Sequence, residues 1–303
     1  MSNAETVVAE LRARGELWDP APGLTSLRGD SLRLYDALSR EMQRVARSET
    51  IDEWSVPAAI PLETLARADY FAAFPQLLTG MAHLSDNAET LEHIAASDDA
   101  ARFASLAMRP SGCALQPAIC YHVYAALSGS EVGDFRCVAV NGTCWRREQD
   151  YVPLERGWSF TMREIVCIGA PADVETFRQR GLGRALTLAQ RLGIAARVAT
   201  ATDPFFAPST RGRMLLQHIK GLKHELLLPL GDGRTVAAAS FNNHERFFGD
   251  AFDIRLHDGS AAASACVAFG VERWLLAYLV AHGADARNWP ILADEPLSTV
   301  AVA

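Results

Sequence analysis

The chain has 303 residues, of which 49% are hydrophobic, and its formal net charge is −7. This length and composition suffice for a full core, in one large domain or two smaller ones. The negative charge argues against an extended nucleic-acid surface, which requires clustered Lys and Arg. No apolar run approaches the roughly 18 residues of a membrane span, and residues 1–17 lack the apolar centre of a signal peptide. We therefore expect a soluble, cytoplasmic protein that does not bind a membrane.

The first hundred residues are predicted to be mainly helical. Residues 1–17 have the pattern of a short amphipathic helix, which the run Pro20 to Gly23 ends. Residues 31–48 carry apolar side chains three to four positions apart, and residues 62–73 and 88–107 are also predicted helices. No heptad pattern is sustained, so a long coiled-coil arm is not expected. We take residues 1–104 as a mainly helical N-terminal region packed on a core formed by residues 105–303.

Strand patterns dominate after residue 104, although residues 118–127 fit either a helix or a strand. Residues 134–140, 225–230, 235–241 and 261–269 are predicted strands, and residues 170–190 and 270–280 are predicted helices. Asn141-Gly142 and Gly231-Asp232-Gly233 are turn signals. Strands that come in hairpins, without βαβ alternation, predict an α+β fold with an antiparallel sheet flanked by helices.

Residues 145–164 are the predicted centre of a binding site. The stretch fits two antiparallel strands joined by a long loop. Because side chains two residues apart on a strand share a face, Arg146 lies with Glu148, and Phe160 with Met162 and Glu164. Charged side chains that face one another from two strands indicate the floor of a site for a charged ligand. Two surface strands with ordinary ion pairs are the alternative.

Several separated motifs resemble those of class II aminoacyl-tRNA synthetases. The run Trp145-Arg146-Arg147-Glu148 is similar to their aromatic-Arg-x-Glu signature, and Phe160-x-x-Arg163-Glu164 is similar to the strand that follows it. Residues 268–273 (AFGVER) resemble the third motif, a Gly-x-x-Arg junction between strand and helix. Residues 240–243 (SFNN) are similar to the seryl-tRNA synthetase segment that lies between the aromatic-Arg-x-Glu motif and the third motif. The resemblance covers about residues 105–285 and implies a class II synthetase-like catalytic core.

A site for ATP is implied by this resemblance. Arg146 would bridge the α-phosphate and the substrate carboxylate, because its guanidinium fork suits the charge that develops when the carboxylate attacks phosphorus. Glu148 would accept a hydrogen bond from the adenine amino group, and Phe160 would stack under the ring. Arg273 would hold the γ-phosphate or cover adenine from a helix N-terminus. The matching positions of Ser240 and Asn243 lie near ATP and the amino-acid substrate.

Mg²⁺ is expected to accompany ATP, but its ligands are left open. The family often has a Glu three residues before the position of Ser240, and this chain has Ala237 there. The residues Lys223 and Glu225 would reach phosphate or form an ordinary exposed ion pair.

A second constellation joins Cys120, Glu164 and Cys266. The placement resembles the methanogen-type seryl-tRNA synthetases, in which a Cys-Glu-Cys zinc site holds the substrate amine. Three protein ligands leave one position of Zn²⁺ open, as in catalytic zinc sites. Zinc binding would also keep both thiols as thiolates. Two buried cysteines and an unrelated carboxylate are the alternative, and the other four cysteines, which form no Cys-x-x-Cys pair, are expected to be structural.

Without a coiled-coil arm, the pattern resembles the amino acid:[carrier protein] ligases. The resemblance implies ATP-dependent activation of glycine or alanine as an aminoacyl-adenylate, and transfer to the phosphopantetheine thiol of a carrier protein. A tRNA-charging seryl-type core and a non-catalytic, amino-acid-sensing paralogue are the alternatives, and tRNA is not the expected partner. Class II cores usually pair, so a homodimer is expected.

An acidic carrier protein would need a local basic surface on this acidic chain. Residues 178–197 offer one, because a single predicted helix carries several arginines, which would steer an acidic partner. These are Arg178, Arg180, Arg184, Arg191 and Arg197. A solvated helix face without a partner is the alternative.

Overall fold

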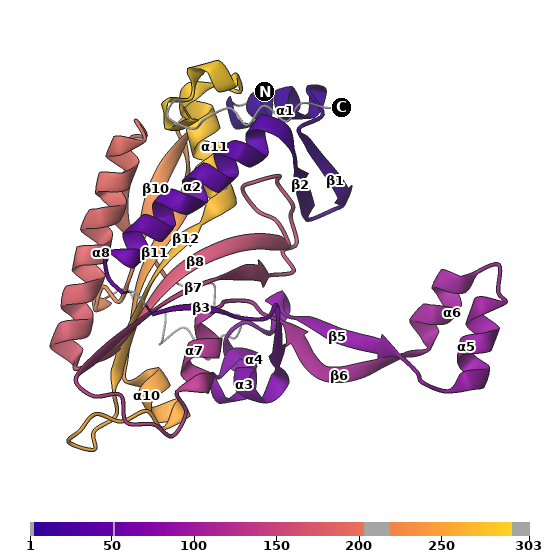
Figure 1. Cartoon of the computed structure of the whole chain (residues 1–303), viewed down its shortest axis with the longest axis horizontal. Helices are drawn as coiled ribbons and strands as arrows, with labels where there is room; N and C mark the ends of the chain where they lie inside the picture. Colours follow the sequence, from indigo (N-terminus) through magenta and orange to yellow (C-terminus); the bar gives the residue numbers. More distant parts are fainter. Residues whose placement is uncertain (1–2, 51, 203–218, 293–303) are drawn as a thin grey trace, which may run out of the picture.

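The computed structural model describes residues 3–50, 52–202 and 219–292. Its centre is a seven-stranded sheet in the order β3-β7-β8-β12-β11-β10-β9 (Figure 1). The strands are β3 (Glu53–Ser55), β7 (Phe135–Trp145), β8 (Ser159–Gly169), β9 (Arg197–Thr200), β10 (Lys223–Gly231), β11 (Arg234–Glu245) and β12 (Ala263–Gly270). All neighbours are antiparallel except β3 and β7, which are parallel. The sheet is therefore mixed, where the sequence predicted an antiparallel one.

Helices cover both faces of this sheet (Figure 1). One face packs on α1 (Asn3–Ala13), α2 (Gly29–Arg47), α8 (Pro171–Arg191) and α11 (Val271–His282), and the other on α3 (Leu62–Arg67), α4 (Tyr70–Ala73), α7 (Cys120–Ala126) and α10 (Phe247–Phe252). Side chains alternate between the faces, so Ile165 and Cys167 join the first hydrophobic cluster and Val166 and Ile168 the second. The predicted α+β fold is confirmed, and residues 118–127 contain a helix.

The N-terminal hundred residues hold more strands than the sequence predicted. They include β3, the hairpin of β1 (Leu17–Ala21) and β2 (Leu24–Leu27), and the strands β4 (Ala59–Pro61) and β5 (Thr79–Leu84), which pair with β6 (Met108–Leu115). These short strands are fixed by distant partners, which a local pattern does not reveal. Helices α5 (Ala88–Ala95) and α6 (Ala100–Leu106) form the tip of an arm that projects from the body (Figure 1), and neither buries a residue. Short 3₁₀ turns lie at Pro75–Leu77, Ala286–Asn288 and Pro290–Leu292.

The predicted turn at Asn141-Gly142 is wrong. Both residues lie inside β7, opposite Arg163 and Met162 of β8. A Cβ at Gly142 would come within 2.9 Å of Ile119 Cγ2, so the glycine allows close packing here instead of a turn.

The division at residue 104 stays a prediction. Helices α1 and α2 contribute to the same hydrophobic cluster as α8 and α11, and β3 belongs to the large sheet. Within the described residues, no helix has the length and apolar character needed to cross a membrane.

Gly181 is the point where α8 packs closely on β12. A Cβ at Gly181 would lie 2.5 Å from Val267 Cγ2, whereas a Cβ at Gly183 would meet nothing within 4 Å. In a helix interior Ala is favoured over Gly by about 1 kcal/mol, but overpacking costs about 1–3 kcal/mol. We expect Gly183→Ala to raise the free energy of unfolding by up to about 1 kcal/mol and Gly181→Ala to lower it by about 1 kcal/mol. Urea denaturation measures both, and equal stabilities would contradict this packing.

Candidate active site

A cavity of about 820 Å³ lies against the face of the sheet that α7 and α10 cover. All nine site residues that the sequence predicts line it. They are Cys120, Arg146, Glu148, Phe160, Glu164, Ser240, Asn243, Cys266 and Arg273. The structure thus brings together residues from the segment after β7 and from β8, β11, β12, α7 and α11, while the role of each remains a prediction.

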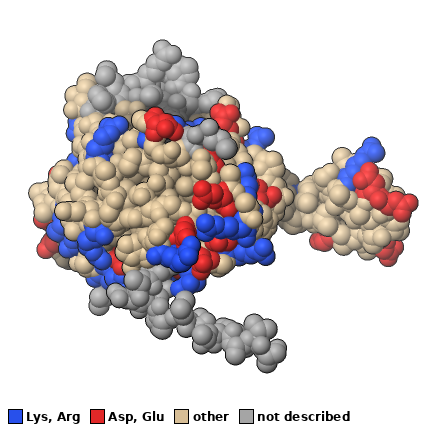
Figure 2. All heavy atoms as spheres, turned by 90° about the horizontal axis from the view of Figure 1, so that it is seen from above, with Lys and Arg blue, Asp and Glu red and all other residues tan. Residues whose placement is uncertain are grey.

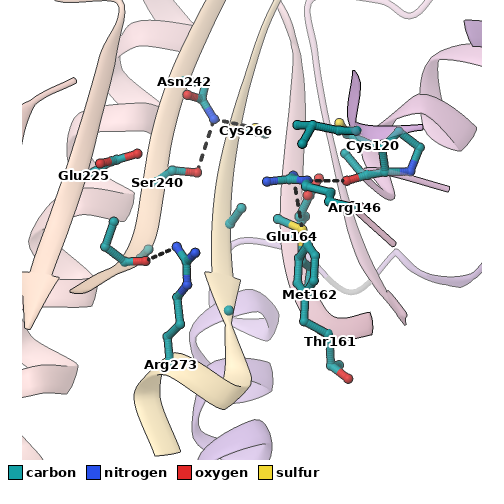
Figure 3. Close-up of a pocket in the computed structure, with 18 of the residues that line it drawn as sticks. Cys120, Arg146, Thr161, Met162, Glu164, Glu225, Ser240, Asn242, Cys266 and Arg273 are labelled. Atoms are coloured by element: carbon teal, nitrogen blue, oxygen red, sulfur yellow. Dashed lines mark hydrogen bonds between the residues drawn. The ribbon is translucent and has the colours of Figure 1, made fainter. Parts of the chain in front are cut away.

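Arg146 follows β7 directly and points across the cavity floor. Its Nε donates to the carbonyl of Pro117 at 2.9 Å, and its guanidinium carbon lies 5.2 Å from the centroid of Phe160 (Figure 3). Strand β7 ends at Trp145, and the Glu148 amide donates to the Arg146 carbonyl, so the chain turns here. The predicted strand through Glu148 is therefore too long, although both side chains line the cavity.

Arg273 enters the cavity from the first turn of α11. Its Nε donates to the carbonyl of Glu155 and its NH1 to the carbonyl of Ala237, each at 2.8 Å. The start of α11 is anchored to β8, because the Glu272 carboxylate accepts from the Thr161 amide at 2.9 and 3.0 Å. Figure 3 shows Arg146 and Arg273 on the two sides of β12.

The two arginines bring two positive charges into this part of the cavity, with Glu148 and Glu225 near them. Burial and the positive charge of Arg146 both lower the pKa of Arg273. Two guanidinium groups that repel one another inside a cavity are stabilised by a bound anion, and a polyphosphate with several oxygens suits both. The ion pair of Lys223 and Glu225, 3.2 Å apart, lies at the edge of this region and is largely buried, where the sequence left an exposed pair open.

Cys120, Glu164 and Cys266 meet in the same cavity, next to Arg146 (Figure 3). Burial raises the pKa of Glu164 to about 8, and the Cys120 thiol reaches both the Glu164 carboxylate and the Cys266 sulfur. Glu164 is 2% exposed, and its Oε2 is buried without a hydrogen-bond partner. An unpaired buried carboxylate oxygen between two thiols indicates a missing cation or donor.

Across the ranges 3–50, 52–202 and 219–292, no three His, Cys, Asp or Glu side chains are arranged as a metal site. The side chains at this end nevertheless suit zinc by chemistry, because thiolate and carboxylate are its usual ligands. The unpaired Oε2 of Glu164 is the observation that fits a bound cation.

Two polar residues of this region were missed by the sequence reasoning. Asn242 Nδ2 lies 3.3 Å from Cys266 Sγ and 3.3 Å from Ser240 Oγ (Figure 3), and His244 Nε2 lies 3.8 Å from the same sulfur. The signal was present in the alternation of β11, because Ser240, Asn242 and His244 are spaced by two and share one face.

Comparisons with known proteins identify the family. No protein-family model matches the chain. It is 36% identical over 237 residues to amino acid–[acyl-carrier-protein] ligase 1 of Bradyrhizobium diazoefficiens, which covers 77% of this chain and 72% of that protein. Ligase 2 of the same organism is 34% identical over 279 residues, with 91% and 82% covered. The chain belongs to the amino acid–[acyl-carrier-protein] ligases. It is therefore an enzyme of the ligase class.

More distant relatives share the fold. The type-2 serine–tRNA ligase of Methanopyrus kandleri is 27% identical over 276 residues, which cover 82% of this chain and 51% of that protein. The crystal structure of M. kandleri SerRS with A. aeolicus tRNASec superimposes with a TM-score of 0.83 at 24% identity, covering 94% of this chain and 59% of that one. The class II synthetase-like fold predicted from the motifs is confirmed.

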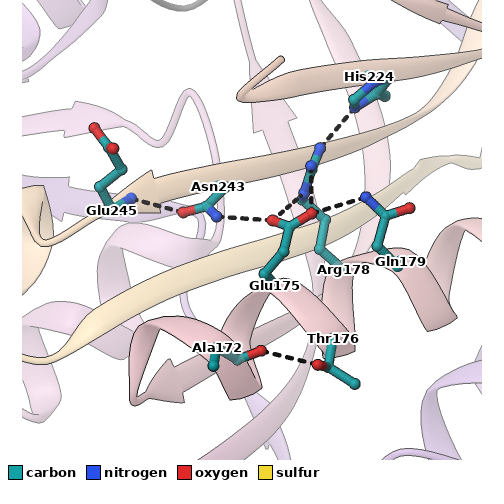
Figure 4. Close-up of polar contacts among 8 residues, drawn as sticks. All are labelled: Ala172, Glu175, Thr176, Arg178, Gln179, His224, Asn243 and Glu245. Carbon is teal, nitrogen blue, oxygen red and sulfur yellow. Dashed lines mark hydrogen bonds and ion pairs between the residues drawn. The ribbon is translucent and has the colours of Figure 1, made fainter. Parts of the chain in front are cut away.

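The side chain of Asn243 is directed at Glu175 of α8 (Figure 4). Its Nδ2 donates to Glu175 Oε2 at 2.9 Å, and its Oδ1 accepts from the Glu245 amide at 2.8 Å. Adjacent strand residues face opposite ways, so the amide that faces the Cys266 end is that of Asn242. The substrate contact of Asn243 stays a prediction: the residue borders the cavity, and its amide forms hydrogen bonds with Glu175 and Glu245.

Arg178 lies in the same network and is not a surface residue. It is 5% exposed, its NH2 donates to Glu175 Oε1 at 2.7 Å, and its NH1 lies 2.6 Å from His224 Nδ1 (Figure 4). Its place in a docking surface was therefore predicted wrongly, because the helix period alone does not show that α8 turns this side toward the sheet.

The carboxylate of Glu175 gives this network a pH dependence. Burial opposes ionisation, but hydrogen bonds from Arg178, Gln179 and Asn243 outweigh it and lower the pKa of Glu175 from 4.5 to about 2. A lowered folded-state pKa contributes stability that is present above the unfolded value and is lost as the pH falls through the folded value.

We therefore expect Glu175→Gln to lower the free energy of unfolding at neutral pH by on the order of 1 kcal/mol, a figure reduced from the full linkage effect because the side chain is 38% exposed. The difference between wild type and variant should shrink as the pH falls from about 5 toward about 2. Denaturation curves across this range measure it, and a difference independent of pH would contradict the assigned interaction.

Proposed function

We propose that this ligase activates a small amino acid, glycine or alanine, with ATP and transfers it to the phosphopantetheine thiol of a carrier protein. The observation that carries the proposal is a single cavity lined by Arg146 and Arg273 and also by Cys120, Glu164 and Cys266. The phosphates of ATP need cationic side chains, and the amine of the amino acid needs a group that binds it, both within one cavity. The family relationship supports a carrier protein as the acceptor.

In the first step the amino-acid carboxylate attacks the α-phosphorus of ATP. A bond forms between a carboxylate oxygen and phosphorus, pyrophosphate leaves, and an aminoacyl-adenylate results. Arg146 would stabilise the charge that develops on the α-phosphate, and Arg273 the terminal phosphates. Phe160 would stack on adenine beside Glu148. Placing both reactants in one cavity lowers the entropic part of the barrier.

In the second step the phosphopantetheine sulfur attacks the activated carbonyl carbon. The carbon–sulfur bond forms, the bond to the AMP oxygen breaks, and the thiol gives up its proton. The nucleophile comes from the carrier protein, so the chain needs to supply only position and charge stabilisation.

The amine of the amino acid is proposed to bind where Cys120, Glu164 and Cys266 meet. These three residues would hold Zn²⁺, with the unpaired Oε2 of Glu164 as one of its ligands. When bound, zinc would accept the free amine in its open position and so select a substrate with a free amine. Mg²⁺ is proposed to enter with ATP; Ala237, at the position of the family's Glu, offers no carboxylate to hold it.

Amino-acid-dependent exchange of pyrophosphate into ATP tests the activation step. Glycine or alanine should support exchange, and larger amino acids should not. No exchange with any amino acid would sink the proposal and favour a non-catalytic paralogue. Exchange that is strongest with serine would favour a tRNA-charging seryl-type core.

The carrier is proposed to be acidic and to dock on the arginines of α8. Without Arg178, these are Arg180 and Arg191, which are exposed, and Arg184, which is half-buried; all three form ion pairs with Glu49 or Glu41. On the face shown in Figure 2, basic and acidic side chains are interspersed, so any basic docking surface is local.

Arg184→Ala should raise the KM for the holo-carrier several-fold while leaving pyrophosphate exchange unchanged, because a rim charge acts on encounter. Arg33→Ala, at a half-buried, ion-paired arginine of α2, is the matched control and should alter neither quantity. An unchanged KM in Arg184→Ala would remove α8 from the docking surface. The proposed homodimer is tested separately by sedimentation, where the mass of a single chain would refute it.

A further inference from the structure

Two nitrogen atoms of β11 approach the sulfur of Cys266. Asn242 Nδ2 lies at 3.3 Å and His244 Nε2 at 3.8 Å. Cys266 on β12 is the direct cross-strand partner of Asn242, and His244 follows two residues later on the same face. Strand pairing therefore determines this contact, since side chains directly opposite on one face lie within reach.

The imidazole of His244 is held in place from its other nitrogen. Its Nδ1 lies 3.3 Å from the hydroxyl of Tyr124 and 3.2 Å from that of Ser264. Tyr124 is completely buried and Ser264 is 1% exposed. The ring of Phe248 stacks on Tyr124 with a centroid distance of 4.0 Å and meets His244 edge-on at 4.9 Å. The imidazole of His244 is thus held in one orientation by buried neighbours.

The two hydroxyls near Nδ1 bear on which ring nitrogen of His244 carries the hydrogen. When one of them donates to Nδ1, that nitrogen carries no hydrogen. The hydrogen of a neutral imidazole then resides on Nε2, which faces the Cys266 sulfur.

We propose that His244 is a positioning residue that donates from Nε2–H to the sulfur of Cys266 and thereby orients and tunes this ligand of the amine-binding zinc site. The inference rests on the zinc site of the proposed function. Groups that hydrogen-bond a metal ligand typically contribute 10–100-fold to metal affinity. A donor at sulfur also withdraws electron density, which alters sulfur-to-metal charge transfer.

Direct ligation is the competing role for the same nitrogen. A ring nitrogen that binds zinc carries no hydrogen, so a Nδ1–H tautomer would be required. The position of one hydrogen therefore separates the two roles.

The tautomer is measured on the metal-free protein labelled with ¹⁵N-histidine. Long-range ¹H–¹⁵N spectra should show the Nε2–H form for His244, whose signal is assigned by its loss in His244→Gln. A Nδ1–H form would overturn the proposal. This readout needs neither zinc nor amino-acid activation, so its failure is distinguishable from a failure of the proposed function.

The effect on the site is measured by chelator competition for zinc and by the spectrum of the cobalt-loaded protein. His244→Leu should weaken zinc binding by about 10-fold or more and shift the sulfur-to-cobalt charge-transfer band. His244→Gln, which retains an N–H donor, should restore part of the zinc affinity and should shift the charge-transfer band less. His224→Leu, on β10 outside the cavity lining, is the control and should change neither. Wild-type affinity and an unshifted band in both His244 variants, or a cobalt spectrum that loses a nitrogen ligand in His244→Leu, would overturn the proposal.

Discussion

Arg146→Ala should reduce kcat/KM for amino-acid-dependent pyrophosphate exchange by about 10²–10³-fold, the usual cost of removing one preorganised donor from a transition state. The guanidinium is fixed by the Pro117 carbonyl and lies over Phe160, so it is held ready at the cavity floor. Arg146→Lys should recover little of the loss, because an ammonium group cannot form the planar fork that bridges two oxygens.

Arg147→Ala is the matched control for this variant. Arg147 is the next residue, it is exposed, and it does not line the cavity. Its removal should leave exchange within about twofold of wild type, as for ordinary surface substitutions. If Arg146→Ala retained wild-type exchange, the α-phosphate would have to bind elsewhere.

Cys266→Ala should lower the zinc affinity by more than about 100-fold, which exceeds the usual loss for a group that only hydrogen-bonds a ligand. It removes one of three proposed ligands and leaves Glu164 and Cys120 to hold the ion alone. The KM for the amino acid should rise with it, because the amine would lose its anchor. Zinc content after gel filtration and exchange kinetics measure the two effects.

Cys167→Ala controls for the loss of a buried cysteine. Cys167 is completely buried on β8, but it faces the opposite hydrophobic cluster. This variant should keep its zinc while losing some stability from the small cavity it creates. Equal zinc content in Cys266→Ala and wild type would refute the ligand assignment.

The sequence predicts the site well where strand alternation applies. Phe160, Met162 and Glu164 share one face of β8 as expected, and Cys266 lies on the same face of the neighbouring β12. Local motifs specify the backbone of β8 and of β12. The side chains of Glu164 and Cys266 therefore meet once these two strands pair.

Other features depend on contacts that no local pattern encodes. The network of Arg178 arises because α8 turns that side toward β10 and β11, and the register of β11 directs Asn243 to the same side. The alternation of β11 places Asn242 and His244 on one face, but their contact with Cys266 follows from the pairing of β11 with β12. The short strands β3, β4 and β5 are likewise specified by distant partners.

Transfer of a radiolabelled amino acid to a carrier protein tests the central proposal most directly. With ATP, glycine or alanine and the purified ligase, the label should appear on the holo-carrier in a bond that hydroxylamine cleaves, as expected for a thioester. The apo-carrier, which lacks the phosphopantetheine thiol, and tRNA should remain unlabelled. Labelling of tRNA in preference to the holo-carrier, or of neither under conditions that support pyrophosphate exchange, would contradict the account.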